Sequence, residues 1–480
     1  MTRINTNVQN LVAKRTLDTN NDSLTTSLRR LSTGLRINTG KDDPAGLIAS
    51  EGLRASKVAI TAAVDNARRA EHVVGIAEAG LGEINALLLE LEDLIDKSAN
   101  EAGLSNDERD ANQLQIDTIL SSINRIAGTT AFNGEKLLDG NYAFTTSGVN
   151  SSKLASLQIN AARVPDGSSR SVTVQVLGSA QTAQITGTVT GLGTSQTNGV
   201  TTIEVRGEFG TEVLSFASGT SVAAMATAIN ASKELTGVSA TTINAATGSS
   251  TTTLRLYSTD FGSDSLVQVR VLNGDFTPST TLDYGQDPTV SVNGQSATMN
   301  GLEGSVRSGN LEMEFYLSGS FATHVLSATT FAITGGGARF SISPDVGLIG
   351  QETIGFPNIN AGSLGNPVVG YLSSLGRGEA NDIRSRNFGE AQRILREAQD
   401  QVSSLRGRIG AFQKDTLQTT VNSLLIAFEN TAAAESAIRD TDFAVETSSL
   451  SRAQILVQTN IATLQMANQL PQNALALLGG

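Results

Sequence analysis

The side chains that could carry out chemistry in this chain are few and scattered. Its two histidines, His72 and His324, fall in different regions. A zinc site of the H-E-x-x-H type needs two histidines four residues apart on one helical face, and this pair cannot supply it. A histidine-based triad would need His324 as its base, but no G-x-S-x-G turn accompanies it. We interpret both histidines as structural or surface residues.

Other reactive groups are equally sparse. The acid pairs Asp42-Asp43 and Glu92-Asp93 are typical of helix starts and solvated faces. The glycine cluster 335–337 lacks the Lys-Ser/Thr of a phosphate loop. The chain has no cysteine, which excludes disulfides and thiolate metal sites. The sequence therefore predicts no catalytic residue, no cofactor and no metal, and a protein that is not an enzyme.

The net charge and the hydropathy of the chain limit the kinds of partner that it could bind. Thirty-four Lys and Arg against 46 Asp and Glu give a net charge of −12, which argues against nucleic acid because phosphates demand a basic face. The start has no apolar core of the kind found in a secretory signal peptide. The most apolar stretch, residues 86–95, is broken by Glu90, Glu92 and Asp93, so no membrane span is expected. These features alone suggest a cytoplasmic protein.

What the chain does carry is long aliphatic stripes. Its first 131 residues contain no phenylalanine, tyrosine or tryptophan, so this end must associate through aliphatic side chains. A helix over roughly residues 44–98 would be about 80 Å long. Along it an apolar residue recurs at every seventh position: Leu53, Ile60, Ala67, Val74, Leu81, Leu88 and Ile95. Such a stripe is a surface for another helix.

Two more segments flank this stripe. Upstream, apolar residues recur at the spacing of three or four, or at its multiple of seven, that is typical of one helix face: Leu17, Leu24, Leu28, Leu31 and Leu35. The sequence 39–44, TGKDDP, predicts the break between helices, with Gly40 ending one and Pro44 opening the next. Downstream, a segment from Leu114 to Ile126 follows the loop at 103–106.

The C-terminal part has matching stripes. Its two heptad rows are Phe388, Leu395, Val402 and Ile409, and Ala391, Ala398, Leu405 and Phe412. The pattern continues through Phe428, and a last amphipathic segment runs from Leu450 to Ala467 and ends before Pro471. We expect the two ends of the chain to pack together.

The middle of the chain changes period from 3.5 to 2. Alternating residues around 172–176, 267–271 and 311–317 are typical of half-buried strands, and Asn273-Gly274 and Asn293-Gly294 of tight hairpin turns. One helix is expected over Val222 to Ala231. The predicted class is α+β, with long coiled-coil-like ends packed together and a β-rich insertion of one or two domains. A helical bundle that does not assemble remains an alternative. Against it, segments 1–35 and 445–480 lack the bulk for a closed core and should order only against copies of themselves.

Particular residues resemble a known family. The run LRRLSTGLRINTGKDDPAGLIAS (28–50) resembles the N-terminal signature of bacterial flagellins, and SRAQILVQTNIATLQMANQLPQNALALL (451–478) resembles their closing segment. TAFNGEKLLDG (130–140) is similar to the loop after their third helix, and residues 226–243 with the following strand resemble a repeat inserted in flagellins and hook-region proteins.

The resemblance implies a structural subunit that polymerises into the flagellar filament and serves motility. Flagellins leave the cell through a type III channel without a cleaved signal, so it implies an extracellular location instead of a cytoplasmic one. The implied partners are further copies of the chain, an export chaperone, the filament cap and the hook–filament junction proteins. Residues 1–43 and 441–480 would form an inner tube, 44–145 and 371–440 an outer tube, and 146–370 the surface-exposed region.

The stripes would then become contacts for self-assembly. For the inner layer we expect Leu24, Leu28, Leu31, Leu35, Leu450, Val457, Ile461 and Leu464. For the outer helical layer we expect Leu81, Leu88, Ile95, Leu395, Val402 and Ile409.

One departure from the family bears on immune sensing. Many flagellins contact an animal receptor through the helix corresponding to 85–99, with an arginine where this chain has Glu90. The family's leucine is kept at Leu94, and a nearby glutamate corresponds to Gln115. Reversed charge at a charged contact is costly, so we expect weak receptor activation.

The alternatives are a hook–filament junction protein, which shares similar ends, and a surface adhesin using the β region. An enzymatic insert is the weakest alternative.

Overall fold

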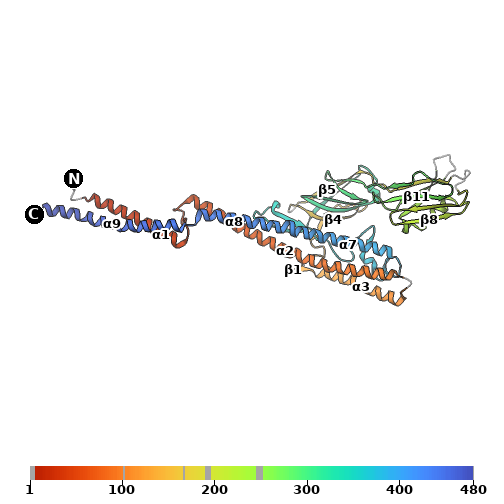
Figure 1. Cartoon of the computed structure of the whole chain (residues 1–480), viewed down its shortest axis with the longest axis horizontal. Coiled ribbons are helices and arrows are strands. Elements are labelled where there is room, and N and C mark those ends of the chain that lie inside the picture. Colours follow the sequence, from red (N-terminus) through yellow and green to blue (C-terminus); the bar gives the residue numbers. More distant parts are fainter. Residues whose placement is uncertain (1–5, 101–102, 166–167, 190–195, 245–251, 479–480) are drawn as a thin grey trace. The chain divides into compact units, whose positions relative to one another are not determined.

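The structure is a computed structural model that describes residues 6–100, 103–165, 168–189, 196–244 and 252–478 (Figure 1). By internal packing the chain divides into two compact units, which we describe separately. The terminal unit comprises residues 1–69, 341–350 and 414–480, and the central unit comprises residues 70–340 and 351–413. The helix α2 (Pro44–Ala99) contributes its first part to the terminal unit and its second part to the central unit.

The terminal unit is built almost entirely of helices. Helix α1 (Val8–Thr33) packs lengthwise against α9 (Phe443–Leu478), as Figure 1 shows. The start of α2 packs against α8 (Thr419–Arg439) through a small cluster of Ile60, Ala63, Val64 and Leu424. A short 3-10 turn, Leu348–Gly350, lies in the remaining segment. The predicted pairing of the two chain ends is confirmed.

The helix boundaries differ from the prediction at two places. Helix α1 ends at Thr33, and Gly34 caps it with a φ of 73°, the left-handed conformation that glycine adopts without strain. Gly40 therefore lies in the connecting turn and does not end the helix. Helix α9 does not stop before Pro471 but continues to Leu478.

The central unit has a helical core made by the second part of α2, α3 (Asn106–Thr129) and α7 (Phe388–Ala411). The N-terminus of α3 is fixed by a capping box between Ser105 and Glu108. Helix α7 is followed by a π-helical turn, Phe412–Gln418. The apolar stripe of α2 is buried from Ile60 to Ile95, as its period of seven predicted.

The first β sandwich consists of two antiparallel sheets over one core of valines, leucines and phenylalanines. One sheet has the order β15 (Gln295–Ser296), β14 (Thr289–Val292), β5 (Arg170–Gly178), β19 (Ala328–Gly336), β3 (Phe144–Ser147). The other has the order β16 (Thr298–Asn300), β17 (Glu303–Ser308), β18 (Leu311–Leu317), β4 (Leu154–Ala162). The turn between β14 and β15 is the predicted Asn293-Gly294, and both residues have positive φ.

The second β sandwich has a separate core, covered by α4 (Val222–Ala231) as predicted and extended by α5 (Lys233–Thr236). One sheet has the order β12 (Phe276–Pro278), β6 (Gln184–Val189), β10 (Thr252–Ser258), β9 (Val238–Asn244). The other has the order β13 (Leu282–Tyr284), β11 (Leu266–Asn273), β7 (Thr201–Arg206), β8 (Thr211–Phe216). Two cores within the β-rich region favour the two-domain alternative.

Short elements complete the central unit. They are β1 (Ala131–Phe132) with β2 (Glu135–Lys136), β20 (Ala338–Ser341) with β21 (Gln351–Ile354), β22 (Gly365–Asn366) with β23 (Gly370–Tyr371), α6 (Gly319–Ala322) and the 3-10 turn Leu372–Leu375. Residues 351–370, which the sequence groups with the β-rich region, instead help to close the helical core. Ile354, Phe356, Ile359, Ala361 and Leu364 are buried in it, beside the apolar residues of α2, α3 and α7.

Candidate assembly surface

The groups considered for catalysis do not form a site. His72 and His324 are both exposed, and His324 Nδ1 lies 2.6 Å from the carbonyl oxygen of Ser320. Within the described ranges no three His, Cys, Asp or Glu side chains gather as metal ligands do. The glycine cluster serves a sheet: a Cβ on Gly336 would lie 2.2 Å from the carbonyl oxygen of Ala143.

The surface with unusual character is that of the paired terminal helices. Among the described side chains of α1 and α9, the buried ones other than Glu446 are small: Ala13 and Ser27 on α1, and Ala453 and Ala467 on α9. Small residues let two helix backbones approach closely. The larger aliphatic residues therefore lie at the margins of this contact, where one partner helix cannot cover them.

The structure divides the eight residues predicted for the inner layer into two groups. Leu24, Leu31, Leu35, Leu450, Val457 and Leu464 are half-buried. Leu28 and Ile461 are 50% and 44% exposed. The first group is thus partly covered within the single chain, whereas the second is largely open to a partner.

More apolar residues are exposed on these helices than the heptad pattern singled out. On α1 they are Val8, Leu11 and Val12, and on α9 they are Phe443, Val445, Ile455, Leu456 and Met466. They escape a search for a single stripe because they lie on other sides of the helix. A helix that is apolar on several sides is normally enclosed by more than one neighbour. The composition of α9 could have indicated them in the sequence, because this helix has only two charged residues, Glu446 and Arg452.

One of the two charged side chains of α9, that of Glu446, is paired with α1. Glu446 is buried, and its carboxylate lies 3.6 Å from the guanidinium of Arg30 on α1. From residue 453 to 478 the sequence has no charged side chain. A partner that covered this part of α9 would therefore not have to strip water from a charged side chain of α9, which is the main cost of burying a charged interface.

The turn between α1 and α2 is held rigidly by Asp42. Its carboxylate accepts hydrogen bonds from the backbone N–H and hydroxyl of Thr39, at 2.8 and 2.9 Å, and from Arg29 Nη2 at 2.8 Å. The bond from the Thr39 backbone is the main reason that the pKa of Asp42 lies below its ordinary value. Asp43 caps α2 by accepting from Gly46 N at 2.9 Å. The motif K-D-D-P thus fixes a corner and performs no chemistry.

The same corner is joined to the corner between α8 and α9. The backbone N–H of Arg36 donates to the carbonyl of Arg439 at 2.7 Å, and that of Thr441 donates to the carbonyl of Gly34 at 2.9 Å. Arg439 also pairs with Glu51 at 2.8 Å. The terminal helix pair is therefore anchored at this end by main-chain contacts.

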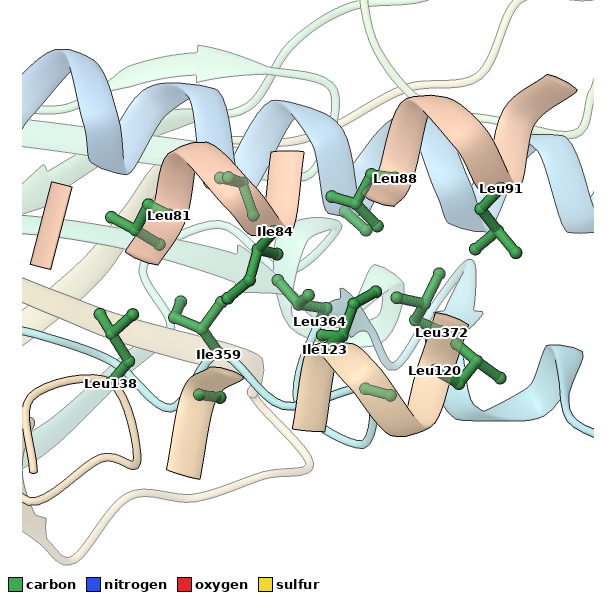
Figure 2. Close-up of a cluster of buried hydrophobic side chains, with 14 of the residues drawn as sticks. Leu81, Ile84, Leu88, Leu91, Leu120, Ile123, Leu138, Ile359, Leu364 and Leu372 are labelled. Atoms are coloured by element: carbon green, nitrogen blue, oxygen red, sulfur yellow. The ribbon is translucent and has the colours of Figure 1, made fainter. Parts of the chain in front are cut away.

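The six residues predicted for the outer helical layer have a different place. Leu81, Leu88, Ile95, Leu395, Val402 and Ile409 are at most 2% exposed within a single chain. Figure 2 shows Leu81 of α2 on the side of Leu138 and Ile359, and Leu91 on the side of Leu120 of α3 and Leu372. These six side chains have no free surface for another subunit. The prediction that they form self-assembly contacts is therefore corrected: they stabilise the subunit's own fold. Buried Gln113 supports the same region, donating to the carbonyl of Leu375 at 2.9 Å and accepting from Ile383 N at 3.0 Å.

The three residues at the expected receptor contact lie on α2 and α3. Glu90 and Gln115 are exposed, whereas Leu94 is only 7% exposed and belongs to the helical core. A partner could reach the first two directly. Leu94 would influence such a contact mainly by positioning the helix.

Helix α2 is long and apolar enough, by length and composition, to cross a membrane. This differs from the expectation that no segment would qualify. One helix of this kind is weak support for a membrane span, because core helices of globular proteins have the same composition.

Comparisons with known proteins give a consistent result. The family model described as bacterial flagellin N-terminal helical region matches residues 4–143, and that described as bacterial flagellin C-terminal helical region matches residues 393–478. A third, the flagellin hook IN motif, matches residues 195–260. Together the matched segments cover more than half of the chain.

Curated relatives align along the full length. The chain is 29% identical to polar flagellin F of Vibrio parahaemolyticus and 27% identical to the B-type flagellin of Pseudomonas aeruginosa, with 99% of each chain covered in both cases. Among solved structures, the D1-D2-D3 domains of the flagellar cap protein FliD from Escherichia coli share 15% identity over 46% of this chain and 64% of that one. The TM-score is 0.28, too low to support a conclusion.

Proposed function

The chain belongs to the bacterial flagellins and is a structural subunit of the flagellar filament, and we propose that the exposed aliphatic side chains of α1 and α9 form its self-assembly contacts. The observation that carries this proposal is the apolar surface of α9 after Arg452, a stretch without charged residues in which Ile455 and Met466 are 63% and 60% exposed. Leu28 and Ile461 belong to the same surface.

The half-buried leucines of the α1–α9 pair contribute indirectly, by holding the two helices together. A flagellin contacts its neighbours through different patches on the two sides of each contact, and such a contact does not close into a ring but grows into a helical polymer. Covering one exposed leucine or isoleucine stabilises each contact by about 1.5–3 kcal/mol when burial is complete. Because every subunit repeats the contact, modest contributions are sufficient.

The further partners follow from the same surface. We propose that the export chaperone binds the segment 453–478 before assembly, since its apolar side chains need cover in the cytoplasm. The filament cap and the hook–filament junction proteins would meet the terminal helices at the two ends of the polymer. The acidic net charge of −12 supports the proposal that neither nucleic acid nor membrane is a partner. The subunit is proposed to reach the extracellular filament by secretion.

We propose that this protein activates the animal immune receptor for flagellins only weakly. The exposed carboxylate of Glu90 stands where many family members carry an arginine, and a reversed charge opposes a complementary partner. A strong reporter-cell response to purified monomer would contradict this.

Truncation tests the main proposal. Removing about 30 residues from either end should leave a folded monomer, because the core of the central unit lies outside these segments. The truncated protein should not polymerise, as judged by electron microscopy and sedimentation beside the full-length chain. Filaments of normal diameter from either truncated form would show that the terminal helices are not the assembly contacts.

A further inference from the structure

The two terminal helices are tied together at both ends of α1. At one end are the main-chain bonds between residues 34–36 and 439–441 described above. At the other end the ties are side-chain amides: Asn7 Nδ2 donates to the carbonyl oxygen of Ala467 at 2.7 Å, and Asn10 Nδ2 donates to Asn468 Oδ1. No charged group takes part in the second tie.

Asn7 has two roles at once. Its Oδ1 accepts from the backbone N–H of Asn10 at 3.0 Å and so caps the N-terminus of α1. Its Nδ2 is then directed to α9. The amide of asparagine suits this position because it carries both an acceptor and a donor. Aspartate has no donor when it is ionised, and the hydroxyls of serine and threonine are on shorter side chains.

The acceptor of Asn7 is available because of Pro471. In a regular helix the carbonyl of Ala467 would accept from the N–H of the residue four positions later, and that residue is Pro471. Proline has no backbone N–H. Helix α9 nevertheless continues through this position, so the Ala467 carbonyl lacks its helical donor, and Asn7 supplies one from the other helix. Ala467 is only 5% exposed. Its carbonyl therefore needs a hydrogen-bond donor from the protein, because a buried backbone carbonyl without one is unfavourable.

The two ties also match in length. Between them lie the 26 residues of α1 on one helix and residues 442–466 on the other. These are nearly equal helical lengths, about 40 Å each. A slip of α9 by one turn, about 5.4 Å, would break the amide tie, the ion pair between Arg30 and Glu446 and the main-chain bonds at the other end. It would leave the apolar contacts largely unchanged. Apolar stripes alone specify axial register weakly, whereas a paired polar group specifies it well.

We propose that Asn7 is a positioning residue that sets the axial register of the terminal helix pair together with the contacts at the other end of α1, and that Pro471 serves to free the carbonyl to which Asn7 binds. This inference deepens the assembly role proposed above. A polymerisation experiment tests the register only if the terminal helices are the assembly contacts, whereas a crosslink between α1 and α9 measures the register directly.

The first experiment measures the critical concentration for polymerisation of full-length variants. Asn7→Ser keeps an N-cap hydroxyl but is too short to reach Ala467, so it separates the tie from the cap. Asn21→Ala, an exposed asparagine on the same helix, is the matched control. Asn7→Ser should raise the critical concentration roughly three- to tenfold, the effect of one lost buried hydrogen bond per subunit, and Asn21→Ala should not.

Pro471→Ala tests the second half of the proposal. An alanine there restores the helical N–H, so Asn7→Ser should add little to the critical concentration in the Pro471→Ala background. An equal effect of Asn7→Ser in both backgrounds would overturn the role of Pro471. An Asn7→Ser variant that polymerises like the wild type would overturn the role of Asn7.

The second experiment uses introduced cysteines, since the chain has none. The pair Asn10→Cys and Asn468→Cys should form an intrachain disulfide in filaments, whereas Asn10→Cys with Leu464→Cys, one turn out of register, should not. Asn7→Ser should reduce the in-register yield. Equal yields for the two pairs would refute a fixed register even if filaments form normally. If the wild type did not polymerise at all, the assembly proposal would fail, and in-register crosslinking of the monomer would still support this inference.

Discussion

Replacing Ile455 by glutamine tests the assembly surface at the most exposed of the large apolar side chains that the structure describes on α9. Ile455 is 63% exposed, so the subunit's own fold gains little from its side chain. Fully burying an isoleucine contributes about 1.5–3 kcal/mol, and covering the remaining exposed fraction would therefore contribute about 1–2 kcal/mol per subunit. At 1.4 kcal/mol per tenfold, the critical concentration should rise roughly five- to thirtyfold in Ile455→Gln.

The assay is sedimentation of polymer grown from short filament seeds over a range of monomer concentrations. Glutamine is uncharged and favours helix, so the variant changes neither the charge nor the helicity of α9 appreciably. Leu272→Gln is the matched control: Leu272 is 45% exposed and lies on β11, which belongs to the central unit. Circular dichroism of the two monomers should be alike. A critical concentration for Ile455→Gln equal to that of Leu272→Gln would refute the assignment of this face to the assembly contact.

Two further predictions concern the central unit. Leu88→Ala should lower its free energy of unfolding by about 2–5 kcal/mol, because Leu88 is fully buried and the cavity cannot collapse. The adjacent Leu89→Ala, at a 54% exposed position, should change it by less than about 0.5 kcal/mol, and equal effects in urea titrations would argue against the core in Figure 2. Burial, together with the nearby carboxylates Glu397, Glu314 and Asp400, raises the pKa of Glu303 above its ordinary value of 4.5. The folded state thus favours the protonated form, and stability is lost as pH rises from 4.5 through the folded-state pKa. Glu303→Gln should therefore raise the melting temperature at neutral pH and not below pH 4.5, and a gain independent of pH would contradict this cause.

The sequence by itself determined the elements with strong periodicity. Seven-residue spacing on α2 and α7 identified the buried stripes, because a regular helix returns the same face to its partner at that interval. Two-residue alternation identified β5, β11 and β18, and the short helix Val222–Ala231 was predicted with its observed bounds. The family also followed from short runs such as 28–50 and 451–478, in which each residue type is locally constrained.

Periodicity does not reveal which partner covers a stripe. Leu81 and Leu28 belong to stripes that look alike in the sequence, yet one is 0% and the other 50% exposed. The difference arises because residues 351–375, distant in the chain, close over α2 and α3, while α1 is covered along its length by α9. Likewise, Pro471 signals a helix end by local rules, and it remains within α9 because a donor from residue 7 satisfies the carbonyl that it leaves unpaired. Contacts between residues far apart in the chain depend on the whole fold, and so only the tertiary structure could decide them.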